Sequence, residues 1–192
     1  FTDGITQLEP QDVAYARELG YVIKHLGIAR QSDAGVELRV HPTLVPERSL
    51  IAGVNDVANA IMVNADAVGT TLFYGPGAGA EPTASAVIAD IVDVARVMDS
   101  YPDSWVPGLG CNSSAIQPRT IMDIEDVETG FYIRFSALDK PGVLSDVTKI
   151  MGDAGISIEA IIQREQPAGE RYVNVIILTN VTKEKFLNEA VT

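Results

Sequence analysis

The sequence predicts an α/β protein of the α+β kind, with helices and strands divided between two domains. Three observations support this fold class. Some stretches repeat apolar residues every three or four positions, as amphipathic helices do, and others alternate apolar and polar residues, as half-buried strands do. Between them, residues 101–130 are rich in proline and glycine and follow neither period. We therefore expect one domain over residues 1–100, a linker over 101–130 and a second domain over 131–192.

Composition narrows the classes of partner. The 192 residues include 14 Lys plus Arg and 26 Asp plus Glu, which gives a formal net charge of −12. An acidic surface repels nucleic-acid backbones and anionic lipid, so we expect no nucleic-acid or membrane partner. The single cysteine, Cys111, and the lack of a secretory leader in residues 1–9 favour a reducing, cytoplasmic location. The chain starts at Phe1 rather than methionine, which indicates a portion of a longer protein.

The first domain is expected to open with a helix over residues 10–26. Pro10 suits its first turn, apolar residues recur at helical spacing, and Gly27 suits its end. Residues 36–41 alternate strictly between apolar and polar side chains, which predicts a strand with one wet face. The polar residues assigned to that wet face are Glu37, Arg39 and His41. We expect no metal or catalytic role for His41, because no second ligand follows at a suitable spacing.

A strand pair and a glycine-rich turn come next. Residues 59–64 and 70–74 are expected to form antiparallel strands. Gly75, Gly77 and Gly79 then lead into a helix. The apolar face of this helix, within 84–98, is expected to pack in a core. Glycines let the backbone approach a ligand, and the helix start offers unpaired N–H groups to an anionic or polar group. The pattern is neither a phosphate loop nor a dinucleotide fingerprint. By itself it fits a ligand-binding loop and a tight strand-to-helix connection equally well.

The second domain is expected to follow the order β-α-β-β-α, one strand short of a ferredoxin-like unit. A further short strand is expected in the linker at 121–124. The elements of the second domain are strands over 131–138, 156–166 and 172–179 and helices over 143–153 and 182–191, the last capped by Thr182.

The turn between the first strand and first helix of this domain reads Asp139-Lys140-Pro141-Gly142. Asp139 can accept hydrogen bonds from an α-ammonium group, and the backbone amides from Gly142 onward, at a helix start, can hold a carboxylate. These are the two charged groups of a free amino acid. The alternative is that Asp-x-Pro-Gly is only a tight turn into a helix.

Several motifs, in the same order along the chain, resemble bacterial homoserine dehydrogenases. The most specific is Gly75-Pro76-Gly77-Ala78-Gly79 followed by Pro82-Thr83-Ala84-Ser85-Ala86-Val87, which resembles the segment that returns that family's chain to its nucleotide-binding domain. The flanking matches are Gly4-Ile5-Thr6, Glu18-Leu19-Gly20-Tyr21 and Val40-His41-Pro42-Thr43-Leu44.

The resemblance implies NAD(P)-dependent interconversion of L-aspartate 4-semialdehyde and L-homoserine, in threonine, methionine and isoleucine biosynthesis. It implies that Gly77, Gly79 and Thr83 lie near NADP or NAD. In the family the proton-transferring lysine, the acidic residues that hold substrate and the dinucleotide fold all precede the segment that begins here. We therefore expect a substrate and dimerisation region without the nucleotide-binding domain, and we assign no catalytic residue and no metal ligand to this chain.

The string Leu138-Asp139-Lys140-Pro141-Gly142-Val143-Leu144 resembles the signature loop of ACT domains, which are amino-acid-sensing modules. This implies allosteric feedback regulation by an amino acid, with threonine as the expected effector and with Asp139, Gly142 and Gln163 as its contacts. The open sheet edges in both regions favour a homodimer or homotetramer. A rival hypothesis is a non-catalytic amino-acid-binding or oligomerisation module. The absence of an acid-rich motif with a lysine in the polypeptide upstream of Phe1 would favour this module over the enzyme.

Overall fold

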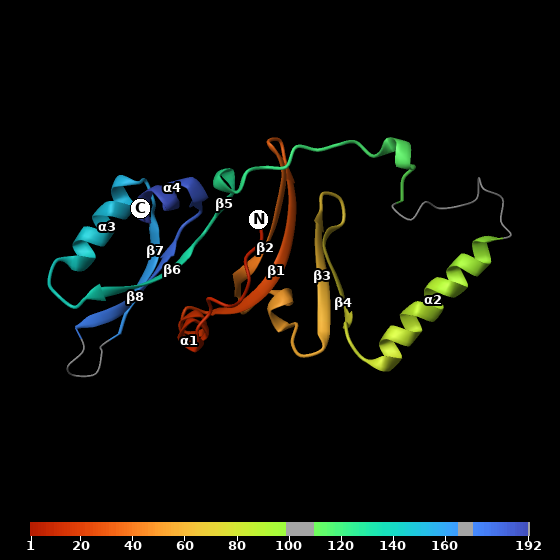
Figure 1. Cartoon of the computed structure of the whole chain (residues 1–192), viewed down its shortest axis with the longest axis horizontal. Helices are drawn as coiled ribbons and strands as arrows, with labels where there is room; N and C mark the ends of the chain where they lie inside the picture. The colour runs from red at the N-terminus through yellow and green to blue at the C-terminus, as the bar shows by residue number, and fades with distance from the viewer. Residues whose placement is uncertain (99–109, 165–170, 192) are drawn as a thin grey trace. The chain divides into compact units, whose positions relative to one another are not determined.

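The computed structural model describes residues 1–98, 110–164 and 171–191 (Figure 1). The chain divides into two compact units. Unit 1 contains Phe1–Leu19, Ile23–Leu44 and Arg119–Thr192, and unit 2 contains Gly20–Val22 and Val45–Pro118. The expected linker residues 101–109 lie outside the described part of the chain.

The first helix, α1 (Pro10–Glu18), is shorter than the sequence predicts. It begins with a capping box formed by Glu9 and Asp12, with Pro10 in the first turn. The Asp12 carboxylate accepts a hydrogen bond from the backbone N–H of Glu9 at 2.8 Å. The expected continuation to residue 26 is wrong, because Gly20 has a φ of 80°, a left-handed conformation that ends helices. A strand starts directly after it.

Strands β1 (Tyr21–Ser32) and β2 (Gly35–Pro46) form a two-stranded sheet. The strand expected at 36–41 is confirmed, but the assignment of its polar residues to a wet face is wrong for Glu37 and Arg39. Glu37 is only 1% exposed and the Arg39 side chain only 10% exposed, whereas Leu38 is 45% exposed. Ion pairs of 2.6 Å from Arg30 Nη2 and from Arg39 Nε flank the Glu37 carboxylate, and this pairing offsets the cost of burying the charge.

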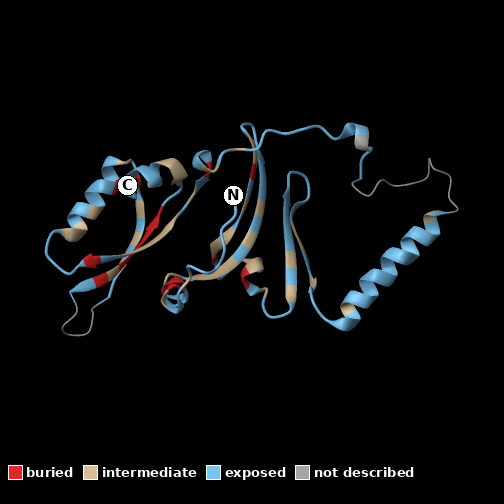
Figure 2. Cartoon of the chain, in the orientation of Figure 1, coloured by how far each residue is buried: buried red, intermediate tan, exposed pale blue. Residues whose placement is uncertain are grey.

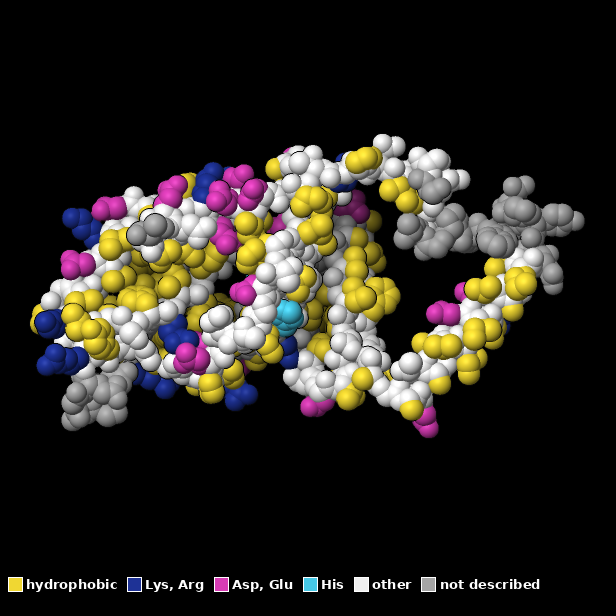
Figure 3. All heavy atoms as spheres, viewed as in Figure 1, with side chains coloured by type: hydrophobic (Ala, Val, Ile, Leu, Met, Phe, Trp, Pro, Cys, Tyr) yellow, Lys and Arg dark blue, Asp and Glu magenta, His cyan; other side chains and the backbone are white. Residues whose placement is uncertain are grey.

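Unit 2 holds the antiparallel hairpin of β3 (Ala58–Ala65) and β4 (Gly69–Pro76), which confirms the predicted strand pair. The glycine turn then leads into α2 (Ala80–Met98), the expected helix. No side chain of α2 is buried among the described residues, so the expected core packing of its apolar face is wrong within this structure. Figure 2 shows α2 almost entirely exposed, and Figure 3 shows hydrophobic side chains along its visible side.

The later part of unit 1 is an α+β module. Its strands pair antiparallel in the order β6-β8-β7, and a second, two-stranded pair joins β5 to β9. Most boundaries agree with the sequence prediction. The elements are β5 (Glu128–Thr129), β6 (Tyr132–Leu138), α3 (Val143–Asp153), β7 (Ile158–Gln163), β8 (Tyr172–Thr179), β9 (Thr182–Lys183) and α4 (Glu184–Val191).

Two boundary predictions in this module are wrong. Thr182 does not cap the last helix, because it pairs with Thr129 in the β5–β9 ladder and α4 starts at Glu184. The strand expected at 121–124 is reduced to a single bridge between Ile121 and Val36, followed by a 3-10 turn, η4 (Ile124–Asp126). In both places a partner that is distant in sequence determines the backbone conformation, so local periodicity cannot predict it.

The core of the module lies between the sheet and α3. It is built from inward-facing residues of β6 and β8 together with helix and loop residues, and partly buried residues of α4 pack against it. The buried members are Ala137, Met151, Ile156, Val173, Val175 and Ile177.

Candidate functional site

The turn from β6 into α3 is shaped by a few backbone contacts. The N–H of Asp139 donates to the carbonyl of Arg171 at 3.1 Å, which ties the turn to the start of β8. Gly142 has a φ of 97° and stands at the N-cap of α3. A residue with a Cβ is strained in that conformation, so the turn requires glycine there.

A cavity of about 170 Å³ opens beside this turn. That space is about six times the volume per molecule in liquid water and smaller than a typical drug-sized pocket, so it suits a small metabolite. Its lining comes from β6, the turn, the start of α3, and β7 and β8. The lining residues are Ala137, Leu138, Asp139, Lys140, Pro141, Gly142, Val143, Leu144, Gln163, Val173 and Val175.

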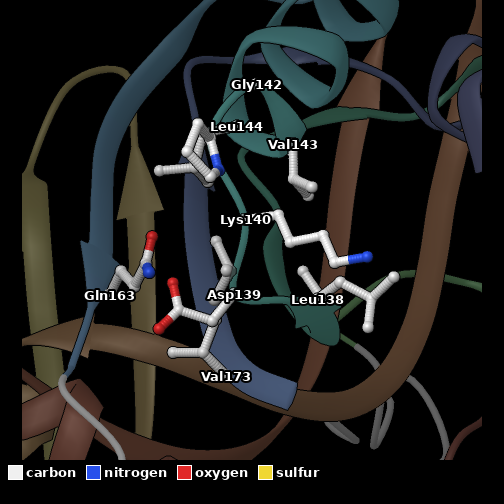
Figure 4. A pocket seen from close by; sticks show the side chains of 11 residues that line it. Leu138, Asp139, Lys140, Gly142, Val143, Leu144, Gln163 and Val173 are labelled. Atoms are coloured by element: carbon white, nitrogen blue, oxygen red, sulfur yellow. The ribbon is translucent and has the colours of Figure 1, made fainter. Parts of the chain in front are cut away.

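The polar side chains of the cavity point in different directions. In Figure 4 the Asp139 carboxylate and the Gln163 amide point toward the same part of the cavity, whereas the ammonium group of Lys140 points away from them. The start of α3 adds N–H groups that lack partners within the helix, together with the positive end of its dipole. The arrangement can bind one cationic and one anionic group beside a small apolar side chain.

The structure brings all three expected effector contacts to this one cavity. Asp139 and Gly142 come from the turn and Gln163 from the end of β7. Sequence reasoning missed the apolar wall, including Ala137, Val173 and Val175. The alternation of valines with polar residues in 172–175 was a usable signal that one face of this strand is apolar.

Of the three expected cofactor-proximal residues, Gly77 and Gly79 lie in the turn between β4 and α2, and Thr83 lies in the first turns of α2. The N–H of Gly77 donates to the carbonyl of Val57 at 2.8 Å, and a Cβ on Gly77 would lie 1.2 Å from Asn59 Nδ2. Gly79 has a φ of 123°, and the N–H of Thr83 donates to its carbonyl at 3.1 Å. The glycines therefore permit a tight connection in which the Asn59 amide fills the space beside Gly77. Thr83 is exposed.

The described residues lack two kinds of feature. No group of three or more His, Cys, Asp or Glu side chains in residues 1–98, 110–164 and 171–191 is placed to hold a metal ion. Within the same ranges, no helix combines the length and apolarity that crossing a membrane requires.

The β-α-β-β-α order, with a pocket at the first strand-to-helix turn, defines the class of the module. Residues 131–185 match the ACT domain family, and residues 1–92 match the homoserine dehydrogenase family. The chain therefore carries a segment of the homoserine dehydrogenase family followed by an ACT domain. This confirms the resemblance found in the sequence.

The relatives agree with this assignment. The chain is 50% identical over 191 residues to a homoserine dehydrogenase of Pseudomonas aeruginosa and 44% identical over 194 residues to one of Neisseria gonorrhoeae. Each alignment covers 100% of this chain and 44% of the relative, so the chain spans less than half the length of these proteins. The crystal structure of a homoserine dehydrogenase from Thiobacillus denitrificans superposes with a TM-score of 0.88 at 51% identity, covering 98% of this chain and 42% of that one.

Proposed function

We propose that the chain is the C-terminal part of an NAD(P)-dependent homoserine dehydrogenase, which interconverts L-aspartate 4-semialdehyde and L-homoserine. The supporting observation is its 50% identity, along its whole length, to a relative that bears this name. In this proposal residues 1–100 complete the catalytic domain, 101–130 form the linker and 131–192 form the regulatory ACT domain. The reaction serves threonine, methionine and isoleucine biosynthesis in the cytoplasm.

The glycine turn is proposed to border the site of NADP or NAD. Thr83 offers an exposed hydroxyl at the start of α2, and Gly79 allows the backbone to lie close to a ligand. Gly77 fits this role through the shape that it gives the turn, because its own N–H is already bonded to Val57. The bound nicotinamide supplies or accepts the hydride.

The test of the enzyme proposal is an activity assay on the longer protein that includes this chain. With L-homoserine and NADP or NAD, nicotinamide reduction is expected to require homoserine. The 192-residue chain alone is expected to be inactive, because no catalytic residue is assigned to it. Absence of homoserine-dependent nicotinamide reduction would contradict the proposal and favour the rival binding module.

The cavity at the β6–α3 turn is proposed to bind a feedback effector, with L-threonine as the expected amino acid. Asp139 would accept from the ammonium group, the start of α3 would hold the carboxylate, and Gln163 would contact the polar side chain. Support comes from the position of all three residues on one small cavity. Effector inhibition requires that the amino acid bind one conformational state better than another.

Isothermal calorimetry on the chain tests the effector site. Titration with millimolar L-threonine is expected to release or absorb heat, and Asp139→Ala is expected to abolish it, because the ammonium group then loses its anionic partner. Asp146→Ala is the matched control, since Asp146 is exposed in the first turn of α3 and does not line the cavity. Unchanged binding by Asp139→Ala would refute the assigned role.

The exposed apolar side chains of unit 2 are proposed to be covered in a larger assembly. Ile88 and Ile91 of α2 are 60% and 61% exposed, and Ile61 and Phe73, a cross-strand pair of the hairpin, are 67% and 62% exposed. Exposed apolar surface of this extent marks interaction sites. We expect the rest of the longer chain and a second copy, in a homodimer or homotetramer, to cover these residues.

A further inference from the structure

The sheet of the ACT domain has two occupied faces. Alternation along β6 points Ile133, Phe135 and Ala137 toward the core beneath α3, so Tyr132 and Arg134 point to the opposite face. On that opposite face lie contacts with α1, a helix that is more than a hundred positions earlier in the sequence. Both α1 and this sheet belong to unit 1.

A buried carboxylate joins α1 to the sheet. Asp12 is 2% exposed, and its Oδ1 accepts a hydrogen bond from Tyr132 Oη at 2.7 Å and one from Arg134 Nε at 2.7 Å. Arg134 also pairs with Glu9 at 3.1 Å. The same side of α1 buries Tyr15 and Ala16, as their spacing of three and four residues from Asp12 requires.

The contacts with α1 continue on β8 and at the end of β7. Asn174 Nδ2 donates to Gln11 Oε1 at 3.0 Å, and Ser136 Oγ donates to Asn174 Oδ1 at 3.0 Å. The guanidinium of Arg164 lies 4.9 Å from the ring centroid of Tyr15 and forms an ion pair with Glu18.

Two residues that contact α1 are immediate neighbours of residues that line the cavity. Asn174 stands between Val173 and Val175, and Arg164 follows Gln163. Ser136, which donates to Asn174 within the sheet, precedes Ala137, which also lines the cavity. A ligand in the cavity and α1 on the opposite face therefore restrain the same short stretches of backbone, from the two sides of a single sheet.

We propose that α1 is the element through which the cavity of the ACT domain acts on the homoserine dehydrogenase segment. The inference rests on the proposed amino-acid site. Docking of α1 orders the strand ends that form the cavity, so the ligand has less ordering to complete and binds more tightly. By linkage the ligand strengthens the docking of α1 to the same extent. Because the chain passes from α1 through Gly20 directly into β1, the docking of α1 restrains the first residues of that strand.

Two variants test the coupling without touching the cavity lining. Gln11→Ala removes the acceptor of Asn174, and Arg164→Ala removes the contacts with Tyr15 and Glu18. Each is expected to weaken L-threonine binding, measured by calorimetry, by about three- to tenfold. Arg17→Ala is the matched control, because Arg17 lies on the exposed side of α1.

Hydrogen–deuterium exchange of the chain gives a readout that loss of global stability does not mimic. Saturating L-threonine is expected to slow exchange in residues 10–18 at least threefold and to leave 58–76 unchanged. The slowing is expected to vanish in Asp139→Ala.

The outcomes separate the two proposals. Heat on binding with no change in α1 exchange, or with the affinity of Gln11→Ala and Arg164→Ala equal to that of Arg17→Ala, overturns the coupling alone. Absence of heat with L-threonine and with each of the other common amino acids overturns the binding site and the coupling together.

Discussion

At the scale of single residues, buried acids organise the beginning of this chain. Glu37 and Asp12 are both almost fully buried, and each is surrounded by cationic or hydrogen-bond-donating groups. Breaking such a pair leaves an uncompensated charge, which costs far more than losing an exposed ion pair. These two carboxylates therefore specify the positions of the elements that carry their partners.

The environment of Asp12 predicts a dependence of stability on pH. Burial by itself would raise the pKa of this carboxyl, but the backbone amide of Glu9, the Tyr132 hydroxyl and the Arg134 guanidinium outweigh it and hold the pKa below its usual value. The same contact and burial raise the pKa of Tyr132. Because the folded state favours the ionised acid, its stabilising contribution is complete above about pH 5 and is lost as the pH falls through the folded-state pKa.

Urea unfolding from pH 7 down to pH 3 measures that contribution. Asp12→Asn is expected to lower the free energy of unfolding by about 2 kcal/mol at pH 7, and the difference from wild type should shrink below pH 4. Asp33→Asn, at an exposed turn position, serves as the control. A difference that stays constant down to pH 3 would contradict the role given to the Asp12 carboxylate.

At the scale of elements, glycines decide where helices start and end. Gly20 ends α1, and Gly142 begins α3 with a φ of 97° beside the cavity. A Cβ on Gly142 would meet no atom within 4 Å, so only backbone conformation restricts the position. Gly152, inside α3, also has open space around its Cβ position but keeps a helical backbone.

The two glycines of α3 predict opposite effects of the same substitution. Gly142→Ala is expected to destabilise the protein by about 1 to 2 kcal/mol, because alanine is strained in the left-handed conformation. Gly152→Ala is expected to stabilise it by about 0.5 to 1 kcal/mol, because alanine is the better helix former. Thermal and urea unfolding measure both, and two changes of the same sign would refute the explanation.

At the scale of the whole molecule, the distribution of apolar surface is uneven. The ACT domain buries its apolar residues beneath α3, whereas α2 in unit 2 leaves Val87, Ile88, Ile91 and Met98 exposed. A helix of this length gains most of its stability from packing, so α2 is expected to be stable mainly when its apolar side is covered.

Association of the isolated chain follows from this surface. Ile88→Lys combined with Ile91→Lys is expected to reduce self-association severalfold in sedimentation velocity, with less than about 0.5 kcal/mol change in unfolding free energy, because both side chains are already exposed. Val181→Lys is the control, since Val181 is 72% exposed and belongs to unit 1. Equal association of the double variant and the control would show that α2 is not the contact surface.

The local sequence pattern was sufficient to predict those elements whose local preference agrees with their tertiary surroundings. The hairpin at 58–76, the helix after the glycine turn and most of the ACT domain follow from apolar periodicity and turn residues. The residues Asp139 and Gly142 were found because their turn chemistry is local. Gln163 was placed by resemblance to the ACT family, and its position on the same cavity depends on the pairing of β7 with β8.

By itself the sequence determined the α+β class, the order of elements in the ACT domain and the families that its two segments resemble, because these depend on neighbouring residues or on shared motifs. Only the tertiary structure decided that Glu37 faces inward, that Thr182 joins a strand and that α1 covers the sheet opposite the cavity. Each of these depends on a partner distant along the chain: Arg30 and Arg39 for the acid, Thr129 for the strand, and Tyr132 with Arg134 for the helix. A buried charge or an unpaired strand is stabilised by whichever partner folding brings to it, and the spacing of residues along the chain does not record that partner.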